Sequence, residues 1–222
     1  RWQHPEYGLI SPARFIPLAE HNGLIDPLTE VIIGKALRDG HLWEKTGLSL
    51  NLSMNLSTTS LIEGDLCNTL LSHCQRWSIN PELITLEVTE SAFVKDLGKS
   101  LEVLTRLRMH GFGLSIDDFG TGYSSLSYLQ KLDVDILKID KSFVDTLEYK
   151  PLTPHIIKMA KALHLATIAE GVETAEQRDW LCQHDVLYAQ GWLYSPALPK
   201  EQFILWAENN LKAHCATLKV NP

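Results

Sequence analysis

The sequence has few cysteines and no long apolar run. Its 222 residues include four cysteines, Cys67, Cys74, Cys182 and Cys215, without zinc-site spacing or the density of a disulfide scaffold. We therefore expect free thiols in a reducing compartment, with Cys67 and Cys74 packed into the core from one helix. No apolar segment approaches the roughly 18–20 residues that cross a bilayer, so we expect no transmembrane helix.

The sequence also lacks basic character and a glycine fingerprint. The formal net charge is −7, whereas proteins that bind nucleic-acid backbones nonspecifically are usually basic. A nucleic-acid polymer is therefore not an expected partner. No glycine fingerprint of the dinucleotide type opens a helix, which disfavours a Rossmann arrangement. An acidic protein can still bind a phosphate ligand when metal ions lie between the two.

Short apolar segments alternate with amphipathic ones along the chain. The expected strands are 48–56, 83–88, 113–116, 134–139, 166–169 and 186–188. Their apolar composition is typical of strands that are covered on both faces of a sheet. Apolar residues at helical spacing predict helices over 27–43, 97–109 and 154–163, and Thr174 begins a capping-box pattern. The alternation indicates an α/β fold with parallel strands and right-handed crossovers, either a doubly wound sheet or a barrel.

The first residues, Arg1-Trp2-Gln3-His4-Pro5, include no methionine, so we expect a segment of a longer chain. With the βα units that follow, this favours a modified (β/α)8 TIM-like barrel whose N-terminal strand or strands are missing. No internal boundary is visible, so residues 1–222 are expected to form one domain.

Polar residues stand where the expected strands end. In a parallel barrel this rim carries the functional groups. The adjacent pair Asp117-Asp118 is the most informative, because neighbouring carboxylates repel unless solvent, a proton or a cation relieves them. The strand-end groups are Asn55, Glu87, Glu90, Asp117, Asp118, Lys138, Asp140, Glu170, Glu173 and Gln190. Any one of these residues could be a helix cap or a surface charge. Because such residues stand at the end of every expected strand, we expect them to form a functional site.

Several carboxylates and an amide oxygen suit hard cations such as Mg²⁺ or Mn²⁺. In a two-metal site a shared carboxylate bridges the ions and a bound water becomes a nucleophile. Asp117 is the predicted bridge and Asp118 a ligand of one ion. Lys138 could hold the water, stabilise the transition state or form a structural salt bridge. Hydrolysis of a phosphate ester fits, while enolate formation with Lys138 as the base stays open.

Ordered motifs along almost the whole chain identify a family. They are Arg1-Trp2-Gln3-His4-Pro5, Phe15-Ile16-Pro17-Leu18-Ala19-Glu20, Asn55-Leu56-Ser57, Leu86-Glu87-Val88-Thr89-Glu90-Ser91, residues 117–129, Leu137-Lys138-Ile139-Asp140-Lys141-Ser142-Phe143-Val144, Ala169-Glu170-Gly171-Val172-Glu173-Thr174 and Gln190-Gly191-Trp192-Leu193-Tyr194-Ser195-Pro196. On these motifs the chain resembles the EAL family of cyclic-di-GMP phosphodiesterases. The resemblance implies a barrel that hydrolyses cyclic-di-GMP to linear pGpG with Mg²⁺ or Mn²⁺.

The resemblance also implies residue roles. The implied ligands of one metal are Asn55, Glu87 and Asp117, and those of the second are Asp117, Asp118 and Glu170. Catalysis is expected from Lys138, which positions the attacking water, and from Glu170, with Arg1 and Gln190 contacting the substrate. Glu90 is expected to steady a loop that couples the site to a dimer interface, and the loop residues are Phe119, Gly120, Thr121, Gly122, Ser124 and Ser125.

The chain departs from the family pattern in one respect: it does not include the signature Glu-Ala-Leu. That signature would lie just before Arg1, with its Glu four residues upstream. That Glu is a metal ligand in the family, so we expect an N-terminally truncated EAL domain whose activity is impaired. A homodimer, a cytoplasmic location and an upstream sensory or membrane domain, with the parent anchored in the inner membrane, are further expectations. The alternatives are a noncatalytic cyclic-di-GMP receptor and an interaction module that binds no nucleotide.

Overall fold

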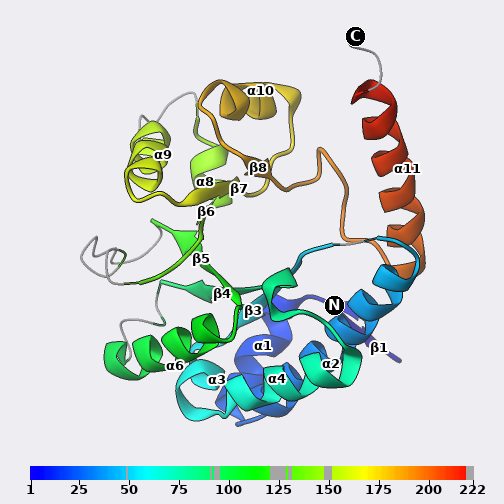
Figure 1. The fold of residues 1–222 in the computed structure, drawn as a ribbon, viewed down its shortest axis with the longest axis vertical. Helices are drawn as coiled ribbons and strands as arrows, with labels where there is room; N and C mark the ends of the chain where they lie inside the picture. The colour runs from blue at the N-terminus through cyan, green and yellow to red at the C-terminus, as the bar shows by residue number, and fades with distance from the viewer. Residues whose placement is uncertain are drawn as a thin grey trace.

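A parallel sheet forms the centre of the computed structural model, which describes residues 1–48, 50–90, 92, 96–120, 129, 132–147 and 152–218, the side chains of Glu63 and residues 211–218 excepted. Its strands are hydrogen-bonded in chain order. They are β3 (Leu52–Leu56), β4 (Ile84–Thr89), β5 (Gly113–Phe119), β6 (Ile136–Ile139), β7 (Ala166–Ala169) and β8 (Tyr188–Ala189). The sheet is curled and helices lie around its outer side, as in the wall of a barrel (Figure 1).

Helices connect the strands and follow the last of them. They are α1 (Pro12–His21), α2 (Ile25–Lys45), α3 (Thr58–Glu63), α4 (Leu66–Trp77), the 3-10 helix η1 (Pro81–Leu83), α6 (Leu97–Met109), α8 (Lys141–Val144), α9 (Leu152–Ala162), α10 (Ala175–Gln183) and α11 (Lys200–Leu218). Among the described residues, none of these helices is long and apolar enough to cross a membrane. A separate antiparallel hairpin, β1 (Trp2–His4) and β2 (Gly8–Ile10), precedes α1.

Local sequence signals explain several element boundaries. The expected strand 166–169 and helix 97–109 match β7 and α6. Thr174 caps α10 in a reciprocal capping box with Gln177, as predicted. The expected strand 48–56 is shorter and begins at Leu52, and the strand expected over 186–188 is displaced to Tyr188–Ala189.

The two faces of the sheet differ in polarity, although buried side chains lie on both of them. Side chains alternate between faces along each strand. The outer face is apolar and buried, as with Leu114 and Ile116 of β5, which join the core that includes Leu104 and Leu107 of α6. The other face, called the inner face below, carries Ser53, Asn55, Thr85, Glu87, Gly113, Ser115, Asp117, Ile136, Lys138, Ala166 and Ile168. The barrel interior is therefore polar where the site lies.

The cysteines of α4 are core residues, as predicted. Cys67 and Cys74 are free and buried, whereas Cys182 of α10 is free and exposed. Burial raises the pKa of Cys74 to about 11. Because the thiolate is the reactive form, Cys74 should resist modification at pH 8 while Cys182 reacts.

Ellman titration of the native protein checks this difference. Replacement Cys182→Ser should remove one fast-reacting thiol, and the matched Cys74→Ser should remove none. A fast phase that disappears in Cys74→Ser would contradict the buried packing.

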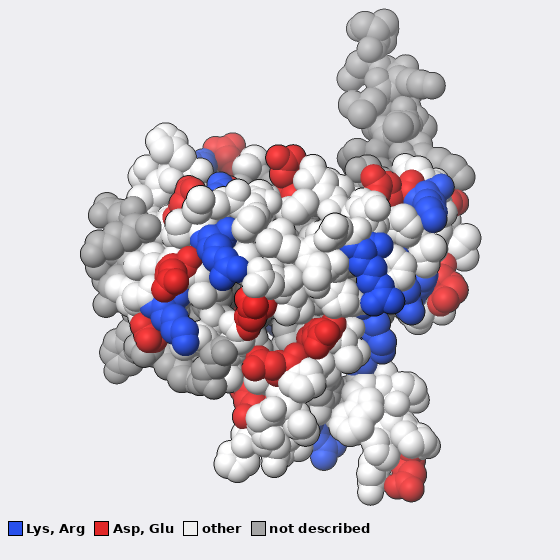
Figure 2. Space-filling model, turned by 60° about the horizontal axis from the view of Figure 1, so that its bottom comes forward, with Lys and Arg blue, Asp and Glu red and all other residues white. Residues whose placement is uncertain are grey.

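Several exposed charges form pairs of opposite sign. Examples are Lys161 with Asp185 at 2.8 Å and Lys141 with Glu173 at 2.9 Å. On the left of the face drawn in Figure 2, acidic and basic side chains lie next to one another. Such exposed pairs contribute little to stability, and they contrast with the buried acidic groups at the strand ends.

Candidate metal centre at the strand ends

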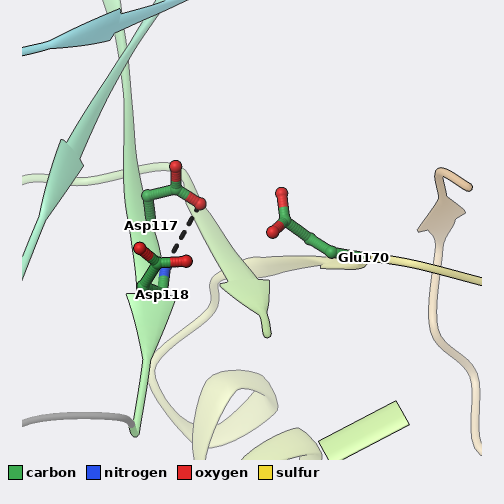
Figure 3. Close-up of side chains that lie close together, drawn as sticks. All are labelled: Asp117, Asp118 and Glu170. Atoms are coloured by element: carbon green, nitrogen blue, oxygen red, sulfur yellow. Dashed lines mark hydrogen bonds between the residues drawn. The ribbon is translucent and has the colours of Figure 1, made fainter. Parts of the chain in front are cut away.

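A β-bulge brings the two adjacent aspartates to the site. Strand β5 pairs with β6 through Ile116 with Leu137 and Phe119 with Ile139, so Asp117 and Asp118 stand opposite Lys138 alone. Asp118 adopts a φ of 53°, a left-handed conformation that aspartate tolerates better than most residues. In a regular strand the two side chains would point to opposite faces. Here both carboxyl groups lie on the side of β5 that faces Glu170 (Figure 3).

Asp117, Asp118 and Glu170 form an acidic cluster. One carboxylate oxygen from each lies within 4.8 Å of the others. The backbone N–H of Asp118 donates to Asp117 Oδ1 at 3.1 Å, which fixes the turn between them (Figure 3). Only oxygen donors are present, the set that Mg²⁺ and Mn²⁺ prefer. Within the described part of the chain, this cluster could hold a metal ion.

Burial and neighbouring carboxylates raise the pKa values of two of these acids. Partial desolvation raises the pKa of Asp118, and the negative charges of Asp117 and Asp140 add to this rise while Lys138 opposes it. Burial also raises the pKa of Glu170, more than its hydrogen bond with Lys138 lowers it. Both shifts mean that the ionised forms are not fully compensated. A bound divalent cation would supply the missing compensation.

Lys138 lies at the centre of three acids. Its Nζ is 2.6 Å from Glu170 Oε1, 2.7 Å from Glu87 Oε2 and 2.9 Å from Asp117 Oδ1. Burial alone would lower the pKa of Lys138, but the hydrogen bonds to these carboxylates outweigh it and the pKa lies above its ordinary value. The side chain is therefore an ammonium at neutral pH, which counts against the general-base role that enolate chemistry would require.

Glu87 and Asn55 occupy neighbouring positions on the inner face. Asn55 of β3 pairs in register with Glu87 of β4, and Glu87 pairs with Ser115 of β5. Glu87 is buried, whereas Asn55 is exposed. Through Lys138, Glu87 is joined to Asp117 and Glu170. Its role as a metal ligand, like that of Asn55, stays a prediction.

Gln190 supports Glu170 directly. Its Nε2 donates to Glu170 Oε1 at 2.6 Å. Backbone hydrogen bonds to Ala169 and from Val172 hold Gln190 in place. A Cβ at Gly191 would come within 2.1 Å of the Val172 carbonyl oxygen, so this close approach requires glycine. The sequence indicated Gln190 as a polar strand-end group but not its contact with Glu170.

Comparison with known proteins identifies the family behind this geometry. The EAL domain family matches residues 1–197. The chain belongs to the EAL domain family. An Escherichia coli K12 protein named "Probable cyclic di-GMP phosphodiesterase PdeB" is 50% identical over 211 residues, which are 95% of this chain and 41% of that protein. The chain therefore spans less than half the length of the curated relatives it matches first.

Solved EAL structures share the fold. One described as "PaMucR Phosphodiesterase, c-di-GMP complex" has a TM-score of 0.88 and 39% identity, over 91% of this chain and 84% of that one. Another, "Klebsiella pneumoniae BlrP1 pH 8.0 calcium/cy-diGMP complex", has a TM-score of 0.74 and 28% identity, over 84% of this chain and 48% of that one. The resemblance and the α/β barrel class predicted from the sequence are thereby confirmed.

Other residues that the EAL motifs single out are not joined to the acidic cluster by the contacts above. Arg1 is exposed ahead of β1. Both carboxylate oxygens of Glu90 are buried and have no hydrogen-bond partner within the described part of the chain. Phe119 is buried at the end of β5, and Gly120 follows it with a φ of 91°. The remaining predicted loop residues, Thr121, Gly122, Ser124 and Ser125, lie outside the described residues.

Two residues of this EAL domain lie near the site without a role assigned from the sequence. Asp140, singled out only as a strand-end acid, raises the pKa of Asp118 and caps α8 by accepting from the Ser142 N–H at 3.0 Å. Ser115 is buried on β5, and its hydroxyl has no hydrogen-bond partner in the residues that the structure describes. The period-2 alternation of a strand could have found Ser115, because it places this residue on the same face as Asp117.

Proposed function

We propose that this EAL domain hydrolyses one phosphodiester bond of cyclic-di-GMP to give linear pGpG, with Mg²⁺ or Mn²⁺ at the acidic cluster. The observation that carries the proposal is the convergence of Asp117, Asp118 and Glu170, with one oxygen of each within 4.8 Å of the others. The relative named as a cyclic di-GMP phosphodiesterase and the phosphodiesterase solved with c-di-GMP support the substrate. A role in second-messenger signalling follows from that substrate.

The residues present fit a pair of hard cations. The donor set contains only oxygen, and burial, with the neighbouring carboxylates, raises the pKa values of Asp118 and Glu170. Asp117 would bridge the two ions, and the remaining ligands would be Asn55, Glu87, Asp118 and Glu170. When bound, such cations activate water for attack on phosphorus and neutralise developing charge. A relative solved with calcium and c-di-GMP agrees with a divalent site.

The chain's own side chains would bind and orient the reactants. Lys138 keeps its proton because of the surrounding carboxylates, so it can donate a hydrogen bond to the attacking water or to a phosphate oxygen. Gln190 holds one oxygen of Glu170 at 2.6 Å and thereby limits the directions in which that carboxylate can turn. Arg1 would contact a phosphate of the substrate through its guanidinium.

The proposal also includes a homodimer and a longer parent protein. Glu90 and the loop from Phe119 to Ser125 would couple the site to a homodimer interface. We further propose that residues 1–222 form an EAL domain of a longer cytoplasmic or membrane-anchored protein with upstream sensory domains. The curated relatives, of which the chain covers 41% or less, support a multidomain parent.

A hydrolysis assay tests the activity. The protein is incubated with cyclic-di-GMP and Mg²⁺ or Mn²⁺, and the nucleotides are separated by ion-pair chromatography. We expect pGpG as the product, no product in EDTA, and faster turnover when the family's Glu-Ala-Leu segment precedes Arg1. Binding of cyclic-di-GMP without hydrolysis, even with that segment, would instead indicate a receptor domain. Absence of both binding and hydrolysis would favour an interaction module.

A further inference from the structure

The hydroxyl of Ser115 is a buried polar group of the inner face to which the proposed reaction assigns no role. Ser115 is 1% exposed, and among the described residues its Oγ has no hydrogen-bond partner. Leaving a buried hydroxyl unpaired destabilises a protein, because the group loses its hydrogen bonds to water and gains none in return. An orphan of this kind beside a functional cluster suggests that its partner arrives in another state of the site.

Its position points to Glu87 as that partner. Ser115 is the register partner of Glu87 on the neighbouring strand, so the two side chains leave the sheet side by side on the inner face. Ser115 also precedes Asp117 by two residues and shares its face. On its other side the register partner is Ile136, whose apolar side chain offers no hydrogen bond.

Glu87 has a different partner in the structure described here. Its Oε2 accepts from Lys138 Nζ at 2.7 Å, and Lys138 also contacts Asp117 and Glu170. The lysine thus engages one oxygen of each of these carboxylates. A cation that binds the Glu87 oxygen now held by Lys138 replaces that contact, and Glu87 then needs a new group to hold its orientation.

We propose that Ser115 is a positioning residue for metal loading, whose hydroxyl donates a hydrogen bond to the Glu87 carboxylate when that carboxylate exchanges Lys138 for a divalent cation. The inference rests on the metal site of the proposed function. Outer hydrogen bonds of this kind orient ligating carboxylates, and their loss typically weakens metal binding about 10–100-fold. Ser115 acts through Glu87 and touches no reacting atom.

The variant Ser115→Ala separates positioning from structural support. Its Mn²⁺ dissociation constant, measured by calorimetry, should rise about 10–100-fold. Its melting temperature in EDTA should stay level or rise, because an unpaired buried hydroxyl has been removed. The matched control is Ser53→Ala, which changes the inner-face serine two residues before Asn55, an exposed position. That control should leave both quantities unchanged.

Three outcomes would overturn the inference. If wild type and Ser115→Ala bind Mn²⁺ within twofold of each other, the metal site stands and the positioning role fails. A lower melting temperature in EDTA with unchanged Mn²⁺ affinity would assign Ser115 a structural role only. If wild type itself binds no Mn²⁺, the proposed metal-dependent function fails, and the role of Ser115 fails with it.

Discussion

Replacement of Lys138 by methionine is expected to destabilise the metal-free protein by about 3–5 kcal/mol, as removal of one partner of a buried ion pair does elsewhere. The Lys138 side chain is 4% exposed, and its Nζ contacts Glu87, Asp117 and Glu170. Without it, these acids face one another with no counter-ion. Urea unfolding in EDTA measures the change.

The matched control is Lys161→Met. Lys161 contacts Asp185 at 2.8 Å, but the two side chains are 47% and 78% exposed, so the loss should be about 0–1 kcal/mol. Equal urea midpoints for Lys138→Met and wild type would contradict the ion-pair assignment. Mg²⁺ should stabilise Lys138→Met more than wild type, because no ammonium has to be displaced.

The pH dependence of this stabilisation has a definite sign. The folded-state pKa of Lys138 lies above its ordinary value. The stabilisation is therefore fully present below the unfolded pKa of about 10.4 and is lost only as the pH rises through the folded value. The difference between wild type and Lys138→Met should accordingly persist from neutrality to about pH 9.

Replacement Asp117→Asn should lower the turnover of cyclic-di-GMP by about 10²–10³-fold, because a metal site supplies several kcal/mol and each 1.36 kcal/mol is tenfold in rate. Asn keeps the volume and one oxygen of Asp117 but removes the charge of the predicted bridge. The substrate assay under Mg²⁺, with circular dichroism as a check of folding, measures the effect.

The control for this variant is Asp185→Asn. Asp185 is exposed and pairs only with Lys161 in the contacts described above, so turnover should not change. Retention of more than a third of wild-type turnover by Asp117→Asn would remove Asp117 from the metal site.

Periodicity predicted the elements that bury a regular apolar face. Strand 166–169 and helix 97–109 were predicted at their observed bounds because their apolar spacing is unambiguous. The hairpin of β1 and β2 was missed because strands of three residues carry too little pattern. The strand β8 has two residues and was displaced for the same reason.

The site was predictable as a set of residue types but not as a geometry. Strand-end positions singled out Asp117, Lys138 and Glu170 before any contact was known. The three contacts of Lys138 depend on where β4, β5 and β7 place their side chains, which a linear pattern does not contain. The orphaned hydroxyl of Ser115 likewise becomes visible only when its neighbours are in place.

The bulge in β5 interrupts the regular pairing of the sheet, but it also brings Asp117 and Asp118 to the same site. A regular ladder between β5 and β6 would need one residue fewer between Ile116 and Phe119, and it would avoid the left-handed Asp118. Such a deletion would relieve backbone strain and leave only one aspartate between those two residues. Selection for stability alone would thus repair this strand. The bulge thus replaces a regular ladder with a second aspartate at the site.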